Sequence, residues 1–246
     1  MKRLNHRHAL TLFSGGQDSS IALAWALERY DAVSTVGFDY GQRHNVELET
    51  RLRVRAEIEA LNPAWSARLK DDVLVDVRGL GALSETSLTR ETAIETADTG
   101  LPTTFVPGRN LIFLGFAAAL AYRIDAGVLV AGMCEEDEAG YPDCRAEALD
   151  RQMAALCAGL DADFALETPV LRIPKSKSWE LAEAIGGTTL VDVILEHSHT
   201  CYLGERGTRH GWGYGCGECP ACTLRAKGWR AYVEERSQGN GQGGGA

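Results

Sequence analysis

The sequence lacks any hydrophobic run of about 18 residues, the length that a membrane-spanning helix requires. Its longest apolar stretch, Leu111 to Tyr122, contains Gly115 and several alanines and ends before Arg123, which predicts a buried helix instead. The charged N-terminal residues are not followed by an apolar region of signal-peptide length with a cleavage site. We therefore expect a cytoplasmic protein with no membrane partner.

Basic residues are also scarce. The chain has 25 lysines and arginines against 34 aspartates and glutamates, which gives a formal net charge of −9 at pH 7. Broad nucleic-acid binding needs a basic surface that displaces counterions from phosphates, so a nucleic-acid partner is not expected. With 246 residues, 45% of them hydrophobic, the chain is long enough for one large domain with its own core.

Four of the seven cysteines gather near the C-terminal end: Cys201, Cys216, Cys219 and Cys222. Two residues lie between Cys216 and Cys219 and again between Cys219 and Cys222. This spacing lets one turn present two sulfurs to a metal. Four thiolates form a closed tetrahedral site, which favours structural Zn²⁺ and a role in folding rather than in catalysis. An iron–sulfur cluster and a set of unligated buried cysteines are the alternatives.

A short loop near the N-terminus has the features of a phosphate-binding site. The apolar run Ala9 to Phe13 predicts a buried strand, and Ser19 to Glu28 predicts a helix, with Ser14-Gly15-Gly16 between them. Glycines let the backbone approach a ligand closely, and the free N–H groups at a helix start attract anions. The loop has no Walker A lysine. An ordinary glycine turn is the alternative interpretation.

Strand-like and helix-like segments alternate along the rest of the chain, with no internal repeat. We expect strands over 32–39, 73–77, 127–132 and 164–171, and helices over 46–61, 110–123, 145–159, 177–185 and 222–235. This alternation predicts an α/β fold with a doubly wound, mostly parallel sheet. Ligands bind such sheets at the carboxyl ends of the strands. The polar segment 79–107 is a long loop, either a lid or partner surface or a plain surface excursion.

The loop sequence Ser-Gly-Gly-Gln-Asp-Ser, residues 14–19, resembles the signature of the ATP pyrophosphatase (PP-loop) family. Four further stretches, 40–44, 106–110, 140–145 and 201–204 together with the cysteine cluster, resemble the 7-cyano-7-deazaguanine (preQ0) synthase family within it. The resemblance covers about residues 10–232. It implies an adenine nucleotide alpha hydrolase-like Rossmann domain over 1–195 and a zinc-binding knuckle of four cysteines over 196–236. The glycine-rich segment 237–246 is expected to be a disordered tail.

The resemblance also implies a reaction and its partners. The substrates would be 7-carboxy-7-deazaguanine, ATP and ammonia, with Mg²⁺ as a cofactor and a homodimer as the assembly. Transfer of AMP turns a carboxylate oxygen into a leaving group, ammonia gives the amide, and a second adenylation followed by elimination gives the nitrile preQ0 of queuosine biosynthesis. Free ammonia is the expected nitrogen source, because the chain has no room for a glutaminase.

The resemblance implies three roles for specific residues. The nucleotide-binding residues would be Leu12, Phe13, Ser14, Gly15, Gly16, Gln17, Asp18, Ser19 and Ser20, with Asp18 capping the helix or holding magnesium. The catalytic residues would be Asp18, His44, Arg109 and Lys175. The substrate-binding residues would be Tyr40, Gln42, Arg43, Glu136, Asp137, Tyr141 and Asp143. Arg109, Lys175 and the acidic run over 135–138 have alternative roles as solvated surface side chains, and His44 could merely donate a hydrogen bond to a neighbour.

Three rival functions use the same features. Another PP-loop ATP pyrophosphatase, such as a tRNA-thiolating enzyme, would need a catalytic cysteine pair and a basic RNA path, which the net acidity disfavours. A paralogue that attaches a deazaguanine to a macromolecule would keep the same motifs. A non-catalytic zinc-ribbon binding protein would predict no ATP turnover, and the intact loop over 14–19 argues against it.

Overall fold

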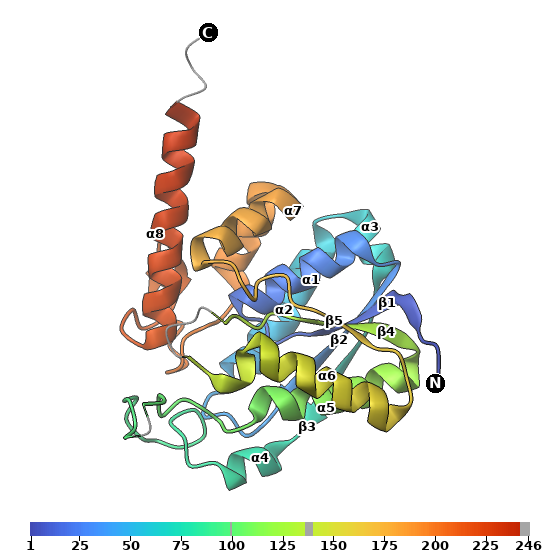
Figure 1. Cartoon of the computed structure of the whole chain (residues 1–246). Helices are drawn as coiled ribbons and strands as arrows, with labels where there is room; N and C mark the ends of the chain where they lie inside the picture. The colour runs from blue at the N-terminus through green and yellow to red at the C-terminus, as the bar shows by residue number, and fades with distance from the viewer. Residues whose placement is uncertain (99, 136–139, 242–246) are drawn as a thin grey trace.

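The computed structural model describes residues 1–98, 100–135 and 140–241, and its centre is a five-stranded sheet (Figure 1). The strands are β1 Asn5–Leu12, β2 Ala32–Asp39, β3 Leu69–Asp76, β4 Ala126–Ala131 and β5 Ala165–Glu167. Their order is β3-β2-β1-β4-β5, and every neighbouring pair is parallel. The expected doubly wound α/β fold is therefore confirmed.

Helices cover both faces of this sheet. They are α1 Gln17–Arg29, α2 Val46–Ala60, α3 Pro63–Arg68, α4 Arg78–Leu83, α5 Arg109–Ile124, α6 Ala146–Leu160, α7 Lys175–His197 and α8 Pro220–Gly241. In Figure 1, α5 and α6 lie on one side of the sheet, and α1, α3 and α7 lie on the other. Within the described ranges, no helix has both the length and the apolarity needed to cross a membrane.

Strand β1 supplies both halves of the core because successive side chains of a strand point to opposite faces. Ala9 belongs to the cluster packed under α1, α2, α3 and α7, whereas Leu10 and Leu12 belong to the cluster under α5 and α6. Ala9 and Leu10 are fully buried, as is Leu129 of β4. Burying a leucine side chain contributes roughly 2 kcal/mol, so this central pair of strands fixes the frame of the sheet.

The order of the strands creates a crevice at one edge. The chain runs from β1 outward to β2 and β3, then returns to place β4 on the other side of β1. Crossovers leave β1 and β4 in opposite directions, so the loops that follow these two strands diverge and leave space between them. This position at the carboxyl ends of β1 and β4 is where a ligand site is expected.

Several segments differ from the sequence expectations. Helix α4 occupies the start of the segment expected as a loop over 79–107, and β3 begins at Leu69 rather than at Val73. The helix expected to end at Gly186-Gly187 does lose its helical dihedral angles there, with φ of +67° at Gly187, but a second helical segment follows at once, so α7 as a whole runs to His197. Strand β5 has three residues rather than eight. Helix α8 continues through 237–241, placed by the sequence in the tail, while residues 242–246 of that tail lie outside the described residues. Surface ion pairs of Glu235 with Lys177 and of Arg236 with Glu183 connect α8 to α7.

Candidate active site

A cavity of about 440 Å³ opens at the carboxyl ends of the central strands. Residues after β1, β2 and β4 line it, together with the start of α5, the start of α7 and residues 199–202 that precede the cysteine cluster. Its size is in the range of small-molecule and cofactor sites. The cavity therefore coincides with the crevice that the strand order predicts.

The loop over 14–19 forms one wall of this cavity and is held by its own hydroxyl groups. Gly15 has φ of +84°, a conformation that favours glycine, and its N–H donates to Ser19 Oγ over 3.1 Å. Ser14 Oγ lies 3.1 Å from Ser19 Oγ and accepts from the Gly16 N–H over 3.3 Å. The 13-residue helix α1 begins at Gln17, so its N-terminus faces the cavity from this loop.

The chain after β4 passes so close to the loop over 14–19 that the position nearest the loop, Gly132, must be a glycine. Gly132 follows β4, and a Cβ atom there would lie 2.6 Å from the Asp18 carbonyl carbon and from the Ser19 nitrogen. On the other side, a Cβ atom on Gly15 would lie 2.6 Å from the Arg51 Cα. The loop backbone is therefore fixed between β4 and α2.

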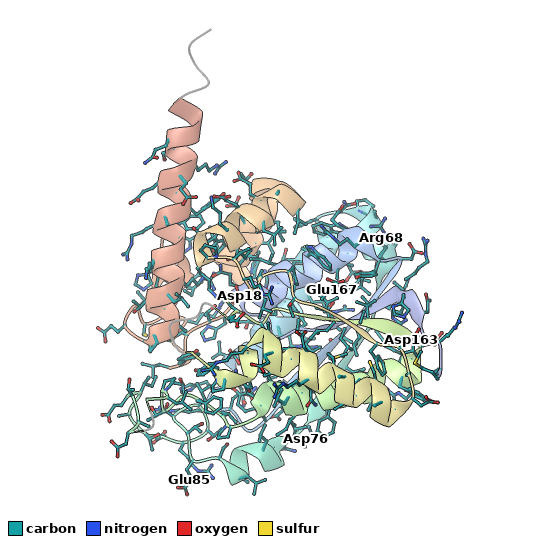
Figure 2. All side chains as sticks on the ribbon, viewed as in Figure 1. Asp18, Arg68, Asp76, Glu85, Asp163 and Glu167 are labelled. Carbon is teal, nitrogen blue, oxygen red and sulfur yellow. The ribbon has the colours of Figure 1, made fainter. Side chains whose placement is uncertain are left out.

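Asp18 and Lys175 form an ion pair across the cavity, although 157 residues separate them. Lys175 Nζ donates to Asp18 Oδ2 over 2.6 Å, and the Lys175 and Asp18 side chains are 9% and 19% exposed, respectively. Figure 2 shows Asp18 at the starting end of α1, far from Asp163 at the opposite end of the sheet. Gly228 of α8 lies against the Lys175 stem, since a Cβ there would come within 2.6 Å of Lys175 Cβ. Helix packing thus places the Lys175 ammonium group beside the loop over 14–19.

Arg109 enters the cavity from the start of α5. The preceding Gly108 has φ of +71°, which turns the chain into the helix. The Arg109 guanidinium lies 5.7 Å from the centre of the Tyr40 ring. Burial raises the pKa of Tyr40 to about 12, even though Arg109 acts in the opposite direction. Tyr40 is therefore a neutral phenol near pH 7, and the positive charge of Arg109 remains available to an anion.

The loop over 84–107 forms the far wall of the cavity through a chain of hydroxyl groups. Thr104 Oγ1 lies 2.6 Å from the Tyr141 hydroxyl, which lies 3.4 Å from the Tyr202 hydroxyl. The ring of Phe105 stacks on Tyr141 at 5.7 Å. Three segments distant in sequence thus meet at this wall. The segment that the sequence leaves as lid or surface excursion contributes to the cavity lining.

Three buried nitrogen atoms of cavity-lining residues are available to a ligand. They are Arg43 Nε, His44 Nε2 and His199 Nδ1, and none has a hydrogen-bond partner within the described part of the chain. Burial lowers the pKa of His199 to about 4, so its ring is neutral near pH 7. Buried polar atoms without a partner cost free energy, so these atoms suit a site that completes their bonds with a bound molecule.

Most of the residues predicted for the site lie together around the cavity. The lining includes Leu12, Phe13, Ser14, Gly16, Gln17, Asp18, Ser19, Tyr40, Gln42, Arg43, His44, Arg109, Tyr141, Lys175 and Cys201. Gly15 and Ser20 support the loop without lining the cavity, and the Ser20 hydroxyl donates to the Gly16 carbonyl over 2.8 Å. Glu136 and Asp137 lie outside the described residues.

Asp143 does not line the cavity. It is 5% exposed, and its Oδ2 accepts a hydrogen bond from the Asn110 N–H over 2.9 Å. The carboxylate therefore holds the first turn of α5, where a negative charge is favourable. Because Arg109 is the neighbour of Asn110, Asp143 fixes the entry of Arg109 into the cavity. A direct contact of Asp143 with substrate stays a prediction.

The four C-terminal cysteines converge on one point. One sulfur from each of Cys201, Cys216, Cys219 and Cys222 lies within 4.8 Å of all the others, and the Cys216 and Cys222 sulfurs are 3.9 Å apart. The Cys219 N–H donates to the Cys216 sulfur over 3.2 Å, which fixes the turn between these two cysteines. This cluster can hold a metal ion. Cys201 lines the cavity as well, so the cluster adjoins it.

Sequence reasoning missed two buried residues that support the loop. Arg51 of α2 is 2% exposed, donates to the Phe13 carbonyl over 2.7 Å and pairs with Asp72. His199 donates its backbone N–H to the Gly15 carbonyl over 3.2 Å, while its Nε2 lies 3.1 Å from the Cys201 carbonyl oxygen. Arg51 belongs to a helix that the sequence predicts. A sign that it is buried would have been its position on the apolar face of that helix, with Val54 and Ile58. His199 is marked only by its position two residues before a cysteine.

The chain matches a known family over nearly its whole length. The family model described as queuosine biosynthesis protein QueC matches residues 8–233. Proteins named 7-cyano-7-deazaguanine synthase are similar to it in several bacteria. The one from Azorhizobium caulinodans is 58% identical over 228 residues, 93% of this chain and 95% of that protein. The one from Bordetella avium is 57% identical over 231 residues, 94% of this chain and 95% of that protein.

A solved structure has a similar fold. It is described as a 4-thiouridine synthetase–RNA complex with bound ATP, and it matches with a TM-score of 0.51 and 16% identity. The match covers 92% of this chain and 53% of the other chain. At this level of identity the likeness shows the fold, which agrees with the sheet and loop described above.

Proposed function

The chain belongs to the queuosine biosynthesis protein QueC family, and we propose on this basis that it converts 7-carboxy-7-deazaguanine and ammonia into 7-cyano-7-deazaguanine with consumption of ATP. The observation that carries the proposal is identity of 56–58% to proteins named 7-cyano-7-deazaguanine synthase over more than nine-tenths of the chain. The cavity with its phosphate loop, Asp18–Lys175 pair and Arg109 supports it.

The reaction has two stages that use the same parts. A carboxylate is a poor electrophile, so its oxygen first takes AMP from ATP, and pyrophosphate leaves. Ammonia then displaces AMP and gives the amide. In the second stage the amide oxygen takes AMP from another ATP as one N–H proton is released, and loss of AMP and the second N–H proton leaves the nitrile. Each adenylation concentrates negative charge on pyrophosphate, which preorganised donors stabilise best.

The proposed roles follow from where these groups lie. The backbone N–H groups and hydroxyls of the loop over 14–19 hold the phosphates at the start of α1. Lys175 neutralises the leaving pyrophosphate, and Arg109 binds the α-phosphate or the substrate carboxylate through its planar guanidinium. Asp18 orients Lys175 through their ion pair. Arg43 and His44, with their buried nitrogen atoms lacking partners among the described residues, contact the nucleotide or the acyl group.

Two metals suit the residues present. The Asp18 carboxylate at the cavity surface offers the oxygen ligand that Mg²⁺ prefers beside phosphates. In the cysteine cluster, a zinc tetrahedron with Zn–S bonds of about 2.3 Å has edges of about 3.8 Å, close to the 3.9 Å between the Cys216 and Cys222 sulfurs. When bound, magnesium would stabilise charge on the phosphates, and zinc would hold the C-terminal region in place.

The deazaguanine would bind beside the aromatic side chains of the cavity. Tyr40 and Tyr141 present ring surfaces, and Gln42 accepts from the Tyr40 N–H over 3.0 Å, which fixes its amide near them. Glu136 and Asp137 remain proposed acceptors for the ring and amino N–H groups of the base. Homodimer assembly and a cytoplasmic location are also proposals, and light scattering of the purified protein tests the assembly.

Mass spectrometry of a complete reaction tests the function. Purified protein is incubated with 7-carboxy-7-deazaguanine, ATP, magnesium and ammonium, and samples are taken over time. We expect the amide to appear first and the nitrile afterwards, with two AMP released for each nitrile. ATP binding without either product contradicts the proposal and directs the search to a macromolecular acceptor for the deazaguanine.

A glycine substitution tests the placement of the loop. Gly132→Ala is expected to lower kcat/KM for ATP by about 10²-fold, because the new Cβ displaces the backbone of Asp18 and Ser19. Gly159→Ala in α6 is the control, since nothing lies within 4 Å of its Cβ position. That variant should keep full activity and gain up to about 1 kcal/mol of stability. Steady-state kinetics and thermal melting check both expectations. Unchanged KM and kcat in Gly132→Ala would contradict the close contact between Gly132 and the loop.

A further inference from the structure

Glu47 is a second carboxylate of the cavity, besides Asp18. It lies in the first turn of α2 and lines the cavity. Arg51, one helical turn further along, contacts the phosphate loop at Phe13 and Gly15. Residues four apart lie on the same face of a helix, so Glu47 lies on the loop side of α2. Glu49, by contrast, is exposed and borders a separate surface groove.

Glu47 is half-buried, and its surroundings are charged. Burial raises the pKa of its carboxyl group, and attraction to Arg109 partly opposes the rise. The Glu47 charge in turn contributes to the raised pKa of Tyr40. Arg43 and His44 precede it in the cavity lining, and Arg51 follows it. Glu47 therefore lies within electrostatic range of Arg109, which would bind the anionic end of the reacting group.

Asp18 and Glu47 are the two carboxylates among the described lining residues of the cavity. Asp18 is paired with Lys175 at 2.6 Å, so accepting a proton would break that ion pair. His44 is a rival base, because its Nε2 lacks a partner among the described residues, but the contact proposed above with the nucleotide or the acyl group uses that nitrogen. These contacts leave Glu47 as the acceptor best suited to a moving proton.

The chemistry needs such an acceptor twice. In the first stage ammonia forms a C–N bond to the adenylated carbonyl carbon, the C–O bond to AMP breaks, and the nitrogen must lose one proton to become a neutral amide. In the second stage adenylation of the amide oxygen releases one N–H proton and gives an imidate, and the imidate then loses its remaining N–H proton. The N–H electrons form the third C–N bond while AMP leaves with the C–O electrons. A carboxylate takes one proton in each stage and returns it to solvent.

We propose that Glu47 is the general base that accepts the N–H proton in both stages, an inference that rests on the proposed function. The proposal requires the Glu47 carboxylate to meet the nitrogen of the reacting group, while Arg109 holds the oxygen side; both residues line the cavity. One residue serves both stages because both remove a proton from the same nitrogen at the same position. Adenylation of the acid transfers no N–H proton, so Glu47 is not required for that step.

Hydroxylamine separates proton transfer from adenylation. Ammonia is mostly protonated at neutral pH and depends on a base, whereas hydroxylamine is uncharged there and gives up its proton to water more readily. It attacks an adenylated acid and gives a hydroxamate without a positioned base. Glu47→Gln should therefore form amide from ammonium about 10²- to 10⁴-fold more slowly than the unaltered protein. It should form hydroxamate at close to the original rate, with the same ATP requirement.

Further variants complete the test. Glu49→Gln, the same change on the exposed side of α2, should leave both products unchanged. Glu47→Asp should recover part of the amide formation. Supplied amide should give no nitrile with Glu47→Gln. Equal losses of hydroxamate and amide in the Gln and Asp variants, or nitrile from supplied amide at the original rate, would overturn the proposal. Absence of nitrile with the unaltered protein would instead overturn the proposed function.

Discussion

Lys175→Met is expected to lower the rate of AMP formation by about 10²- to 10³-fold, the usual effect of removing one preorganised donor from a developing charge. Lys175 Nζ lies 2.6 Å from Asp18 Oδ2 and is 9% exposed, so water cannot easily replace it. Its charge acts in a medium of low dielectric, where in the proposed role it would stabilise the leaving pyrophosphate more strongly than a solvated lysine would.

Lys177→Met is the matched control. Lys177 lies two residues further along α7 and is 46% exposed, with Glu180 and Glu235 as partners on the surface. Surface ion pairs contribute about 0–1 kcal/mol, so this variant should keep its activity and nearly all of its stability. The two variants remove the same charge from the same helix, and they differ in whether that charge faces the cavity.

The expected loss must be separated from a loss of folding. Removing Lys175 leaves Asp18 partly buried without this partner, which costs free energy, so thermal melting and ATP binding are measured beside the rate. Asp18→Asn should show a loss of similar size, and the double variant should be little worse than either single one. Normal AMP formation by Lys175→Met, or additive losses in the double variant, would show that the pair does not act as a unit.

The sequence predicts those parts of the site that depend on local structure. The turn at Ser14 to Gly16 follows an apolar strand and precedes a helix, so its conformation and its anion-binding amides depend on neighbours in the chain. The parallel sheet follows from alternating segments, and the convergence of Cys216, Cys219 and Cys222 follows from a spacing of two residues. In each case the interacting groups are close in sequence.

The rest of the site depends on contacts between distant segments. The ion pair of Asp18 and Lys175 spans 157 residues, and the hydroxyl chain of Thr104, Tyr141 and Tyr202 joins three separate loops. Glu47 lies in a helix that the sequence predicts correctly. Which of its faces points to the cavity depends on packing against the loop. Tertiary packing decides these positions, and no periodicity or spacing encodes it.

Cys219→Ser should release the bound metal and destabilise the protein by about 4 kcal/mol, or roughly 10 °C in Tm for a chain of this size. Cys219 is 5% exposed and its sulfur lies within 4.8 Å of the three other cysteine sulfurs. Cys157→Ser is the control, because Cys157 is half-buried and lies outside this cluster. It should keep the metal and change stability by no more than about 1 kcal/mol.

The loss should reach the active site as well as the C-terminal region. Cys201 lines the cavity beside His199, whose N–H donates to the Gly15 carbonyl of the phosphate loop. Pro220 and Ala221, at the start of α8 within the cluster, line the same cavity. A freed Cys201 therefore loosens a direct support of the loop, and ATP binding should weaken before global unfolding. Metal analysis, melting curves and ATP titration at a temperature well below Tm check this sequence. Metal loss with unchanged melting and ATP affinity would contradict the structural role of the cluster.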